Sequence, residues 1–294
     1  MSLAEDETVS QLIALAKRED LGAGDLTSGL LPRAGAVADF RFLARQRGVF
    51  AGGEIAPRVL HAYDPSILIE WSAGGRDGAR IESPPTELAM IHGPLGAVLS
   101  AERVMLNFVQ RLCGVATLTQ AFVDAVSGTG AKILDTRKTT PGWRTLEKYA
   151  VRCGGGRNHR AGLFDAVLIK DNHLAGVPTD RLAGAMFEML NALSTSGARP
   201  AFIEVEATDV AQVEELLKVV GIDTILLDNF SIEAMREAVR LRDDVGLRGK
   251  VSLEASGGVT LRTVRAIAET GVERISVGAL THSATAIDLS LERI

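Results

Sequence analysis

The sequence has little of several features that mark specialised classes of protein. Only two of its 294 residues are cysteines, Cys113 and Cys153, and no second Cys or His stands near either at the spacing of a metal site. Neither a disulfide framework nor a structural zinc site is therefore predicted. A reducing cytoplasm is the compartment that this cysteine usage favours.

Long apolar runs and a strong charge of one sign are missing as well. No uninterrupted apolar stretch approaches the roughly 18 to 20 residues that span a bilayer. Residues 1–20 carry acids and an amphipathic pattern, whereas a signal peptide needs a positive start and an apolar block. The net charge is −5, so no overall field attracts nucleic acid or an anionic membrane. We expect a soluble protein that binds neither, in which any anion site is local.

What the sequence does have is a composition that can form a core, with 46% hydrophobic and 23% charged residues. A single hydrophobic core stops growing at about 250 to 300 residues, so two domains are expected from this length. The first, residues 1–113, has mixed signals, with helices near 8–18 and 54–63 and strands near 38–44, 66–72 and 86–92. A long apolar helix over 97–127, expected to break near Gly114, connects the domains.

Residues 114–280 alternate regularly between short apolar runs and amphipathic helices. The runs that read as buried parallel strands are 131–136, 166–170, 201–207, 224–228, 251–256 and 274–279. The later strands start 23 to 27 residues apart, which is typical of repeating β/α units in a barrel or a doubly wound sheet. The last segment, about 281–294, is expected to form a helix that packs back on the first domain.

Polar residues stand at the ends of these predicted strands: Asp135, Lys170, Glu204, Asp228, Ser256 and Gly278. In a barrel of parallel strands the carboxyl ends surround the active site. The strand pattern therefore indicates where the chemistry of the protein lies.

The strongest local signal is a cluster of positive charge over 137–170. It contains eight lysines and arginines against two acids, although the whole chain is net negative. Arg137 and Lys138 follow a predicted strand and lead into a turn, so their side chains should project at the strand end. Lys148 and Arg152 fit a solvated helical face instead. The cluster predicts a site for an anionic ligand.

The segment CGGGRNHR, residues 153–160, places three glycines before Asn158, His159 and Arg160. Three glycines permit positive φ and the close approach of a ligand or another chain, and a flexible surface turn is the alternative. Lys170 ends the next predicted strand. It reads as an ammonium that pairs with a substrate anion, as a Schiff-base nucleophile with a lowered pKa, or as a capped structural lysine.

Two acids follow neighbouring strands. Glu204 and Glu206 share one strand face because Val205 takes the other. Glu204 with Asp228 offers two carboxylates for a divalent cation or for sugar hydroxyls, and ion pairs with the basic cluster are the alternative.

A glycine-containing turn follows the strand over 251–256. Ser256, Gly257 and Gly258 lead into a helix expected to begin at Thr260, and Gly278 ends the next strand. Backbone N–H groups in such a turn, together with a helix N-terminus, resemble a phosphate cradle.

Over 135–174 the sequence DTRKTTPGWRTLEKYAVRCGGGRNHRAGLFDAVLIKDNHL closely resembles nicotinate-nucleotide pyrophosphorylases, also called quinolinate phosphoribosyltransferases. Further similarity over 19–28, 101–117, 203–207, 226–230 and 253–259 extends the resemblance to nearly the whole chain. The family implies an N-terminal α/β sandwich domain, an incomplete TIM-like α/β barrel, and a homodimer with shared active sites in which each sandwich meets the partner's barrel.

The resemblance also implies an activity in de novo NAD biosynthesis. With Mg²⁺, the phosphoribosyl group of phosphoribosyl pyrophosphate is transferred to quinolinate, and nicotinate mononucleotide, pyrophosphate and CO₂ are formed. Such an enzyme is a pentosyl transferase that acts on small molecules.

The family's functional positions can be carried over residue by residue. Its quinolinate-binding positions correspond to Arg137, His159, Arg160 and Lys170, with Arg103 as the arginine supplied across the dimer. Lys138 corresponds to a residue shared between the two ligands, and Glu204 and Asp228 correspond to the acids near the ribose and the metal, which they would hold directly or through water. The phosphate-binding backbone corresponds to Ser256, Gly257, Gly258 and Gly278. The catalytic set implied is Lys138, Lys170, Glu204 and Asp228.

Three positions depart from the family pattern. Gly96 stands where arginine is common, Cys113 where serine is common, and Trp143 where leucine is usual. Three rival interpretations remain: a molybdenum-transport-associated paralogue with the same fold and a similar DTRK segment, a barrel aldolase that uses Lys170 as a Schiff base, and an anion-sensing regulator without catalysis.

Overall fold

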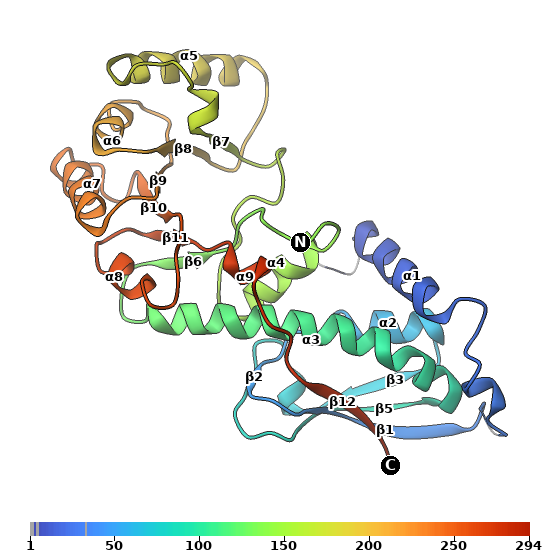
Figure 1. Ribbon diagram of the computed structural model, residues 1–294. Helices are drawn as coiled ribbons and strands as arrows, with labels where there is room; N and C mark the ends of the chain where they lie inside the picture. The colour runs from blue at the N-terminus through green and yellow to red at the C-terminus, as the bar shows by residue number, and fades with distance from the viewer. Residues whose placement is uncertain (1–2, 4–5, 33) are drawn as a thin grey trace. The chain divides into compact units, whose positions relative to one another are not determined.

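The computed structural model of the protein describes residues 3, 6–32 and 34–294, and these form two compact units (Figure 1). Unit 1 comprises Met1–Gln120, Lys138–Gly156 and Leu280–Ile294, and unit 2 comprises Ala121–Arg137 and Arg157–Ala279. The chain thus passes between the units several times. The expected domain limits, 1–113 and 114–280, are continuous ranges, whereas these units are not, and the limits remain a prediction.

Unit 1 is built on a four-stranded antiparallel sheet with the order β12–β1–β5–β3. Its strands are β1 (Val37–Ala44), β3 (Leu68–Trp71), β5 (Thr86–Pro94) and β12 (Leu289–Arg293). In β1, Phe40 and Phe42 are buried while Val37 is exposed, as expected of a sheet with one face on a core. Helices α2 (Ala56–Tyr63) and α3 (Leu95–Ala125) run along this sheet in Figure 1.

Smaller elements complete this part of the chain. They are α1 (Glu7–Leu21), β2 (Gly48–Val49), β4 (Arg80–Ile81), α4 (Arg144–Cys153) and α9 (Ala279–His282), with 3₁₀ turns at Ser28–Leu30 and Ala73–Gly75. Asp6 caps α1 by accepting a hydrogen bond from the Val9 N–H, which satisfies one of the helix's unpaired donors.

Helix α3 does not break near Gly114, so that expectation is wrong. A Cβ at Gly114 would lie 2.2 Å from the carbonyl oxygen of Thr285. A Cβ at Gly154 would lie 2.3 Å from the carbonyl oxygen of Ala116, and one at Gly156 would lie 2.7 Å from Thr119 Cγ2. Glycine is therefore needed at these positions because other segments lie against them. The triple glycine over 154–156 therefore allows the close approach of helix α3, which belongs to the same chain.

The C-terminal segment is a strand, so the helix expected over 281–294 is wrong. Helix α9 ends at His282, and β12 pairs antiparallel with β1, with Phe42 opposite Leu291. Leu289 and Leu291 alternate with polar neighbours, which is the period of a strand. The segment adds an edge strand to the sheet of unit 1.

Unit 2 contains a six-stranded parallel sheet with the order β6–β11–β10–β9–β8–β7. Its strands are β6 (Lys132–Leu134), β7 (Val167–Ile169), β8 (Ile203–Ala207), β9 (Thr224–Asp228), β10 (Ser252–Ser256) and β11 (Arg274–Ser276). Each of the six predicted runs contains one of them, so the parallel β/α interpretation is confirmed.

The helices of unit 2 are α5 (Leu182–Thr195), α6 (Val210–Leu216), α7 (Ile232–Asp244) and α8 (Val264–Ala268), with 3₁₀ turns at Asp171–His173 and Thr179–Arg181. They contact one another in sequence and lie along one side of the strands in Figure 1. The strand order is that of a barrel opened between its first two strands, with β6 and β7 at the edges. The α/β fold class is confirmed, and the described ladder is an open sheet.

Within the described residues, no helix combines the length and the apolar character needed to cross a bilayer.

Candidate active site

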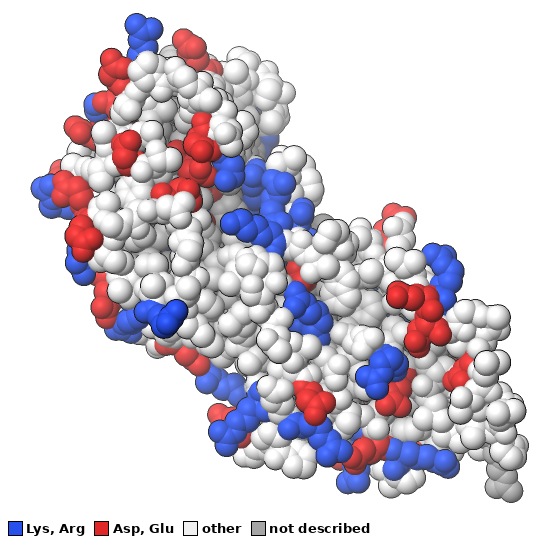
Figure 2. Space-filling model, in the orientation of Figure 1, with Lys and Arg blue, Asp and Glu red and all other residues white. Residues whose placement is uncertain are grey.

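The carboxyl ends of the unit 2 strands carry polar residues along one edge of the sheet. Asp135 and Arg137 follow β6, Lys170 follows β7, and Asp228 and Ser256 end β9 and β10. Because parallel strands all end at the same edge, these residues share one side of unit 2. Figure 2 shows Lys and Arg side chains gathered beside Asp and Glu side chains where Figure 1 draws β7 and β8.

The loop over residues 157–160 is fixed to the end of β6. Arg157 bridges Leu134 in parallel, and its N–H donates to the carbonyl oxygen of Ile133 at 2.8 Å. Asp135 is fully buried and accepts from the His159 N–H at 2.9 Å and from Asn158 Nδ2 at 2.5 Å. The buried carboxylate therefore orders the loop that presents His159 and Arg160.

The ring of His159 faces the interior of unit 2. Its Nε2 lies 2.7 Å from Glu204 Oε2 and 3.5 Å from Glu254 Oε1. Its Nδ1 accepts from the Arg160 N–H at 2.8 Å, so the hydrogen on Nε2 is the one that points at the two acids. His159 thus connects the loop to the buried carboxylates beneath it.

Burial shifts the pKa of both of those acids. It raises the pKa of Glu204 to about 7, against the opposing charges of Arg274 and Arg160. The pKa of Glu254 is also raised, first by burial and then by the neighbouring charge of Glu204. Desolvation disfavours the charged carboxylate in each case.

Arg160 is a nearly buried cation, with 9% of its surface exposed. Burial lowers its pKa, and so does the charge of Arg137, while Glu204 and Asp165 oppose that shift. The next turn is tied down because Asp165 accepts from the N–H groups of Ala161 and Gly162 at 2.7 and 2.9 Å. Two guanidinium groups that repel each other are well suited to a ligand with more than one negative charge.

Lys170 forms an ion pair with Glu206. Its Nζ lies 2.9 Å from Glu206 Oε2, and its side chain is 47% exposed while that of Glu206 is 5% exposed. A Schiff-base lysine relies on desolvation, whereas this amino group is open to water and paired with a carboxylate. The geometry favours an ammonium that contacts an anion.

The strand register separates the two acids predicted to hold a metal. Glu204 lies opposite Thr224, and Asp228 stands four residues further along β9. At about 3.3 Å per residue this places them roughly 13 Å apart along the strands, whereas Glu206, opposite Leu226, lies roughly 7 Å below Asp228. Glu204 is fully buried against His159. Asp228 and Glu206 therefore fit a shared cation better than Asp228 and Glu204 do.

The turn after β10, where a phosphate cradle is predicted, contains two glycines with positive φ. Gly257 and Gly258 have φ of 95° and 58°, and the Asn229 N–H donates to the carbonyl oxygen of Ser256 at 2.9 Å. A Cβ at Gly257 would lie 2.1 Å from Asn229 Oδ1, so only glycine fits. Helix α8 begins at Val264 and not at Thr260, so the cradle is a loop. The last predicted member, Gly278, follows β11.

Two predicted site residues belong to unit 1. Arg103 is exposed on α3, and Lys138 is exposed with its carbonyl oxygen accepting from Thr281 Oγ1 at 2.7 Å. Arg137, His159, Arg160 and Lys170 all belong to unit 2, together with the acids and the glycine turn. The structure therefore brings most of the predicted residues together on a single unit.

The three departures from the family pattern have local explanations. Trp143 stacks on Phe108 with ring centroids 4.8 Å apart. Cys113 is buried, and its Sγ accepts from the Ala51 N–H at 3.2 Å. At Gly96, a Cβ would lie 3.3 Å from Ala34 Cβ, so that position is tightly packed.

Sequence reasoning did not assign a role to Glu254 or Arg274 and did not place Glu206 at the site. The available signal was the period of two within a strand. Glu254 stands two residues before Ser256, and Glu206 two residues after Glu204. Residues at that spacing face the same side of a strand, so each acid faces the side already predicted to be functional.

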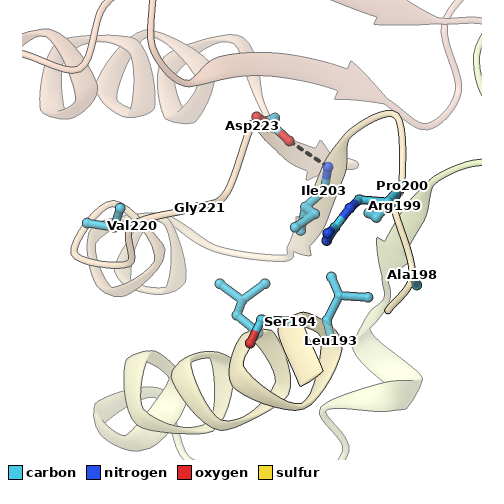
Figure 3. A pocket seen from close by; sticks show the side chains of 10 residues that line it. Leu193, Ser194, Ala198, Arg199, Pro200, Ile203, Val220, Gly221 and Asp223 are labelled. Carbon is cyan, nitrogen blue, oxygen red and sulfur yellow. Dashed lines mark hydrogen bonds between the residues drawn. The ribbon is translucent and has the colours of Figure 1, made fainter. Parts of the chain in front are cut away.

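A groove of about 370 Å³ lies at the opposite end of the strands (Figure 3). It is lined by Leu193 of α5, Ile203 at the start of β8 and Asp223 just before β9, and the Ile203 N–H donates to Asp223 Oδ2 at 2.7 Å. Since catalytic residues of parallel β/α units stand at the carboxyl ends, this groove is separate from the candidate site.

Comparison with known proteins identifies the family of the chain. Residues 25–113 match the family model "Quinolinate phosphoribosyl transferase, N-terminal domain", and residues 115–292 match the corresponding C-terminal domain. The chain is 41% identical over 300 residues to the nicotinate-nucleotide pyrophosphorylase [carboxylating] of Mycobacterium leprae, covering 99% of both chains. It is 40% identical over 294 residues to quinolinate phosphoribosyltransferase [decarboxylating] 1b of Nicotiana tabacum, covering 96% of this chain and 81% of the relative.

A solved structure shares the whole fold. The nicotinate-nucleotide pyrophosphorylase from Francisella tularensis superposes with a TM-score of 0.87 at 36% identity, covering 100% of this chain and 99% of that one. Both family domains are matched in order, and each of these matches covers at least 96% of this chain. The chain therefore belongs to the quinolinate phosphoribosyltransferase family.

Proposed function

We propose that the protein transfers the phosphoribosyl group of phosphoribosyl pyrophosphate to quinolinate, giving nicotinate mononucleotide, pyrophosphate and CO₂. The observation that carries this proposal is the set of cations at the strand ends, Arg137, Arg160 and Lys170, on the same edge as the glycine turn after β10. One edge of unit 2 thus offers a place for a dicarboxylate and a place for a phosphate. The activity belongs to de novo NAD biosynthesis.

Quinolinate carries two adjacent carboxylates, and the planar guanidinium groups of Arg137 and Arg160 match them. A guanidinium can bind a carboxylate through two parallel N–H donors, and each charge-assisted bond contributes roughly 1.5 to 3 kcal/mol. Lys170 adds an ammonium next to Glu206. These groups orient the pyridine nitrogen toward the sugar.

Phosphoribosyl pyrophosphate fits the remaining features of the edge. The N–H groups of Gly257 and Gly258 suit the 5′-phosphate. The family resemblance adds Gly278 to the same phosphate-binding backbone. Asp228 and Glu206 suit the ribose hydroxyls and Mg²⁺, directly or through water. Bound there, Mg²⁺ would supply charge neutralisation for the departing pyrophosphate.

The chain itself contributes positioning and charge to the reaction. Attack of the ring nitrogen on the anomeric carbon develops positive charge on the sugar, which the carboxylate of Asp228 would stabilise. Lys138 and Lys170 supply positive charge toward the two anionic substrates. Once the ring nitrogen is alkylated, its positive charge stabilises the electron pair that CO₂ leaves on the adjacent ring carbon. That carbon then takes up a proton from water, so decarboxylation needs no further nucleophile from the protein.

The test is pyrophosphate release with quinolinate, with nicotinate and with no acceptor. Nicotinate lacks the carboxylate next to the ring nitrogen and leaves cations of the site unpaired. Sites built around polar partners reject such analogues by about 10⁴ to 10⁵ in kcat/KM, and we expect that preference here. Comparable rates with the two acids would contradict the proposal. Covalent trapping by borohydride would indicate the aldolase, and binding without pyrophosphate release would indicate the regulator.

We also propose that the protein acts as a homodimer in which Arg103 serves the partner's site. Its support is the exposed position of Arg103 on α3 together with the family resemblance. Arg103→Ala and Lys170→Ala should each be inactive, and mixing them should restore activity, because one site of each heterodimer then has both residues. Proven subunit exchange without recovery would contradict a shared site.

A cytoplasmic location is the remaining part of the proposal. It is supported by the two free cysteines. Burial raises the pKa of Cys113, and it raises the pKa of Cys153 to about 12, so both remain thiols. Cell fractionation checks it, and recovery in a membrane or secreted fraction would contradict it.

A further inference from the structure

A cluster of buried polar side chains lies inside unit 2 beneath the 157–160 loop. Its members are His159, Glu204, Glu254 and Arg274. Glu204 and Glu254 have no exposed surface, and the side chain of His159 is 7% exposed. Burying two acids is costly unless they are paired, and a buried ion cluster is weak evidence for stability. Stability alone therefore does not account for the cluster.

Glu254 and Arg274 form an ion pair within the cluster, next to Glu204. Arg274 Nε donates to Glu254 Oε2 at 2.6 Å, and the other oxygen of Glu254 lies 3.5 Å from His159 Nε2. The Arg274 guanidinium also lies over the ring of Phe202, 5.4 Å from its centroid. The His159 ring meets the same Phe202 edge-on, at 5.3 Å and 88°. The pair thus contacts His159 in two ways. The Glu254 oxygen lies near Nε2 without forming a hydrogen bond, and Arg274 and His159 share the ring of Phe202.

The orientation of the His159 ring is passed on to Arg160. The Arg160 N–H donates to His159 Nδ1 at 2.8 Å, so the ring contacts the backbone that carries the guanidinium. Asp135 holds the preceding backbone N–H. A rotated His159 ring would break the contact to the Arg160 N–H while the Asp135 contact remained.

We propose that Glu254 and Arg274 are positioning residues that hold His159, and through it Arg160, in the arrangement that receives the dicarboxylate acceptor. This inference rests on the proposed function. Because they are proposed to act through His159 and Arg160, their effect should fall on the acceptor and not on phosphoribosyl pyrophosphate. Displacing a binding group by about 1 Å can cost up to about a hundredfold in rate.

The variants Glu254→Gln and Arg274→Lys test this inference, and Glu273→Gln is the matched control. Glu273 directly precedes Arg274, and its carboxylate pairs with the buried Arg242 at 2.8 Å and accepts from the Leu253 N–H at 2.9 Å. Glu254→Gln should raise the KM for quinolinate about tenfold or more and change the KM for phosphoribosyl pyrophosphate less than about twofold. Glu273→Gln should lower the melting temperature and leave both KM values unchanged.

A double-mutant cycle with His159→Asn shows whether Glu254 acts through the histidine. If it does, Glu254→Gln should have little further effect on the quinolinate KM once His159 is replaced. Equal effects in both backgrounds would overturn the inference. So would an unchanged quinolinate KM in folded Glu254→Gln or, should that variant fail to fold, in Arg274→Lys. Lack of pyrophosphate release by the wild-type protein would overturn the proposed function itself, which distinguishes the two failures.

Discussion

The sheets of the two units differ in what they bury. The strands of unit 1 bury apolar side chains such as Phe40, Phe42 and Leu88. The strands of unit 2 bury the acids Glu204, Glu206 and Glu254 in addition to apolar residues. Apolar burial supplies stability in proportion to area, whereas buried charge costs stability unless it is compensated. The sheet of unit 1 therefore supports the fold, and the sheet of unit 2 also holds charged side chains in position for its ligands.

The largest expected effect on stability is in the sheet of unit 1. Phe42 is fully buried and contacts Phe50 at 6.4 Å between ring centroids. Phe42→Ala should lower the free energy of unfolding by about 3 to 5 kcal/mol, through lost burial and the cavity left behind. Denaturant titration measures it. Val37→Ala, on the exposed face of the same strand, is the control with little change, and a similar loss in both variants would contradict the expectation.

The next effect should fall on binding and leave the fold unchanged. Arg160→Ala and Arg137→Ala should each weaken quinolinate binding by roughly 2 kcal/mol or more, because a carboxylate loses its charge-assisted partner. Calorimetry gives the dissociation constants. Arg181→Ala, on the exposed surface of unit 2, should bind normally. Unchanged affinity in both site variants would contradict the assignment of Arg137 and Arg160 to the dicarboxylate pocket.

The buried acids should make the stability of the protein depend on pH, whereas the apolar core should not. The folded-state pKa of Glu204, about 7, lies above its usual value of about 4.3. Between these values the folded protein binds the extra proton, so stability falls as pH rises through this range. Glu204→Gln removes that loss, and its stability relative to wild type should be higher at pH 8 than at pH 5 by on the order of 2 kcal/mol. An equal difference at both pH values would contradict the raised pKa.

The smallest effect is expected for charge at the surface. Arg265 and Glu269 form an exposed ion pair at 2.6 Å on the outside of unit 2. Exposed pairs are worth little, so Glu269→Gln should change the free energy of unfolding by about 0.5 kcal/mol or less. A change as large as that of Phe42→Ala would contradict the expectation that surface charge contributes little to the stability of unit 2.

Features set by residues adjacent in the sequence, such as strands, were predicted most accurately. All six parallel strands were found because short apolar runs such as TILLD stand out locally. The role of Gly114 was missed because the atom it accommodates belongs to Thr285, far away in the sequence. No local pattern distinguishes a glycine that breaks a helix from one that lets another segment approach.

The candidate site was predicted in residue type more than in position. The cationic loop and the glycine turn were found from their composition. Whether Glu204 or Glu206 stands nearer to Asp228 depends on how β8 aligns with β9, and that alignment is set by tertiary packing. Likewise, Glu254 gained its significance only when the structure placed it beside His159.

The antiparallel pairing of β12 with β1 has a consequence for synthesis of the protein. The two strands come from opposite ends of the chain, with Phe40 opposite Arg293. Translation proceeds from the N-terminus, so β1 leaves the ribosome early, and one of its edges stays open until residues 289–293 follow. An open strand edge is a template for wrong pairing between chains. The nascent protein is therefore exposed to wrong pairing at β1 from the synthesis of that strand until the synthesis of β12.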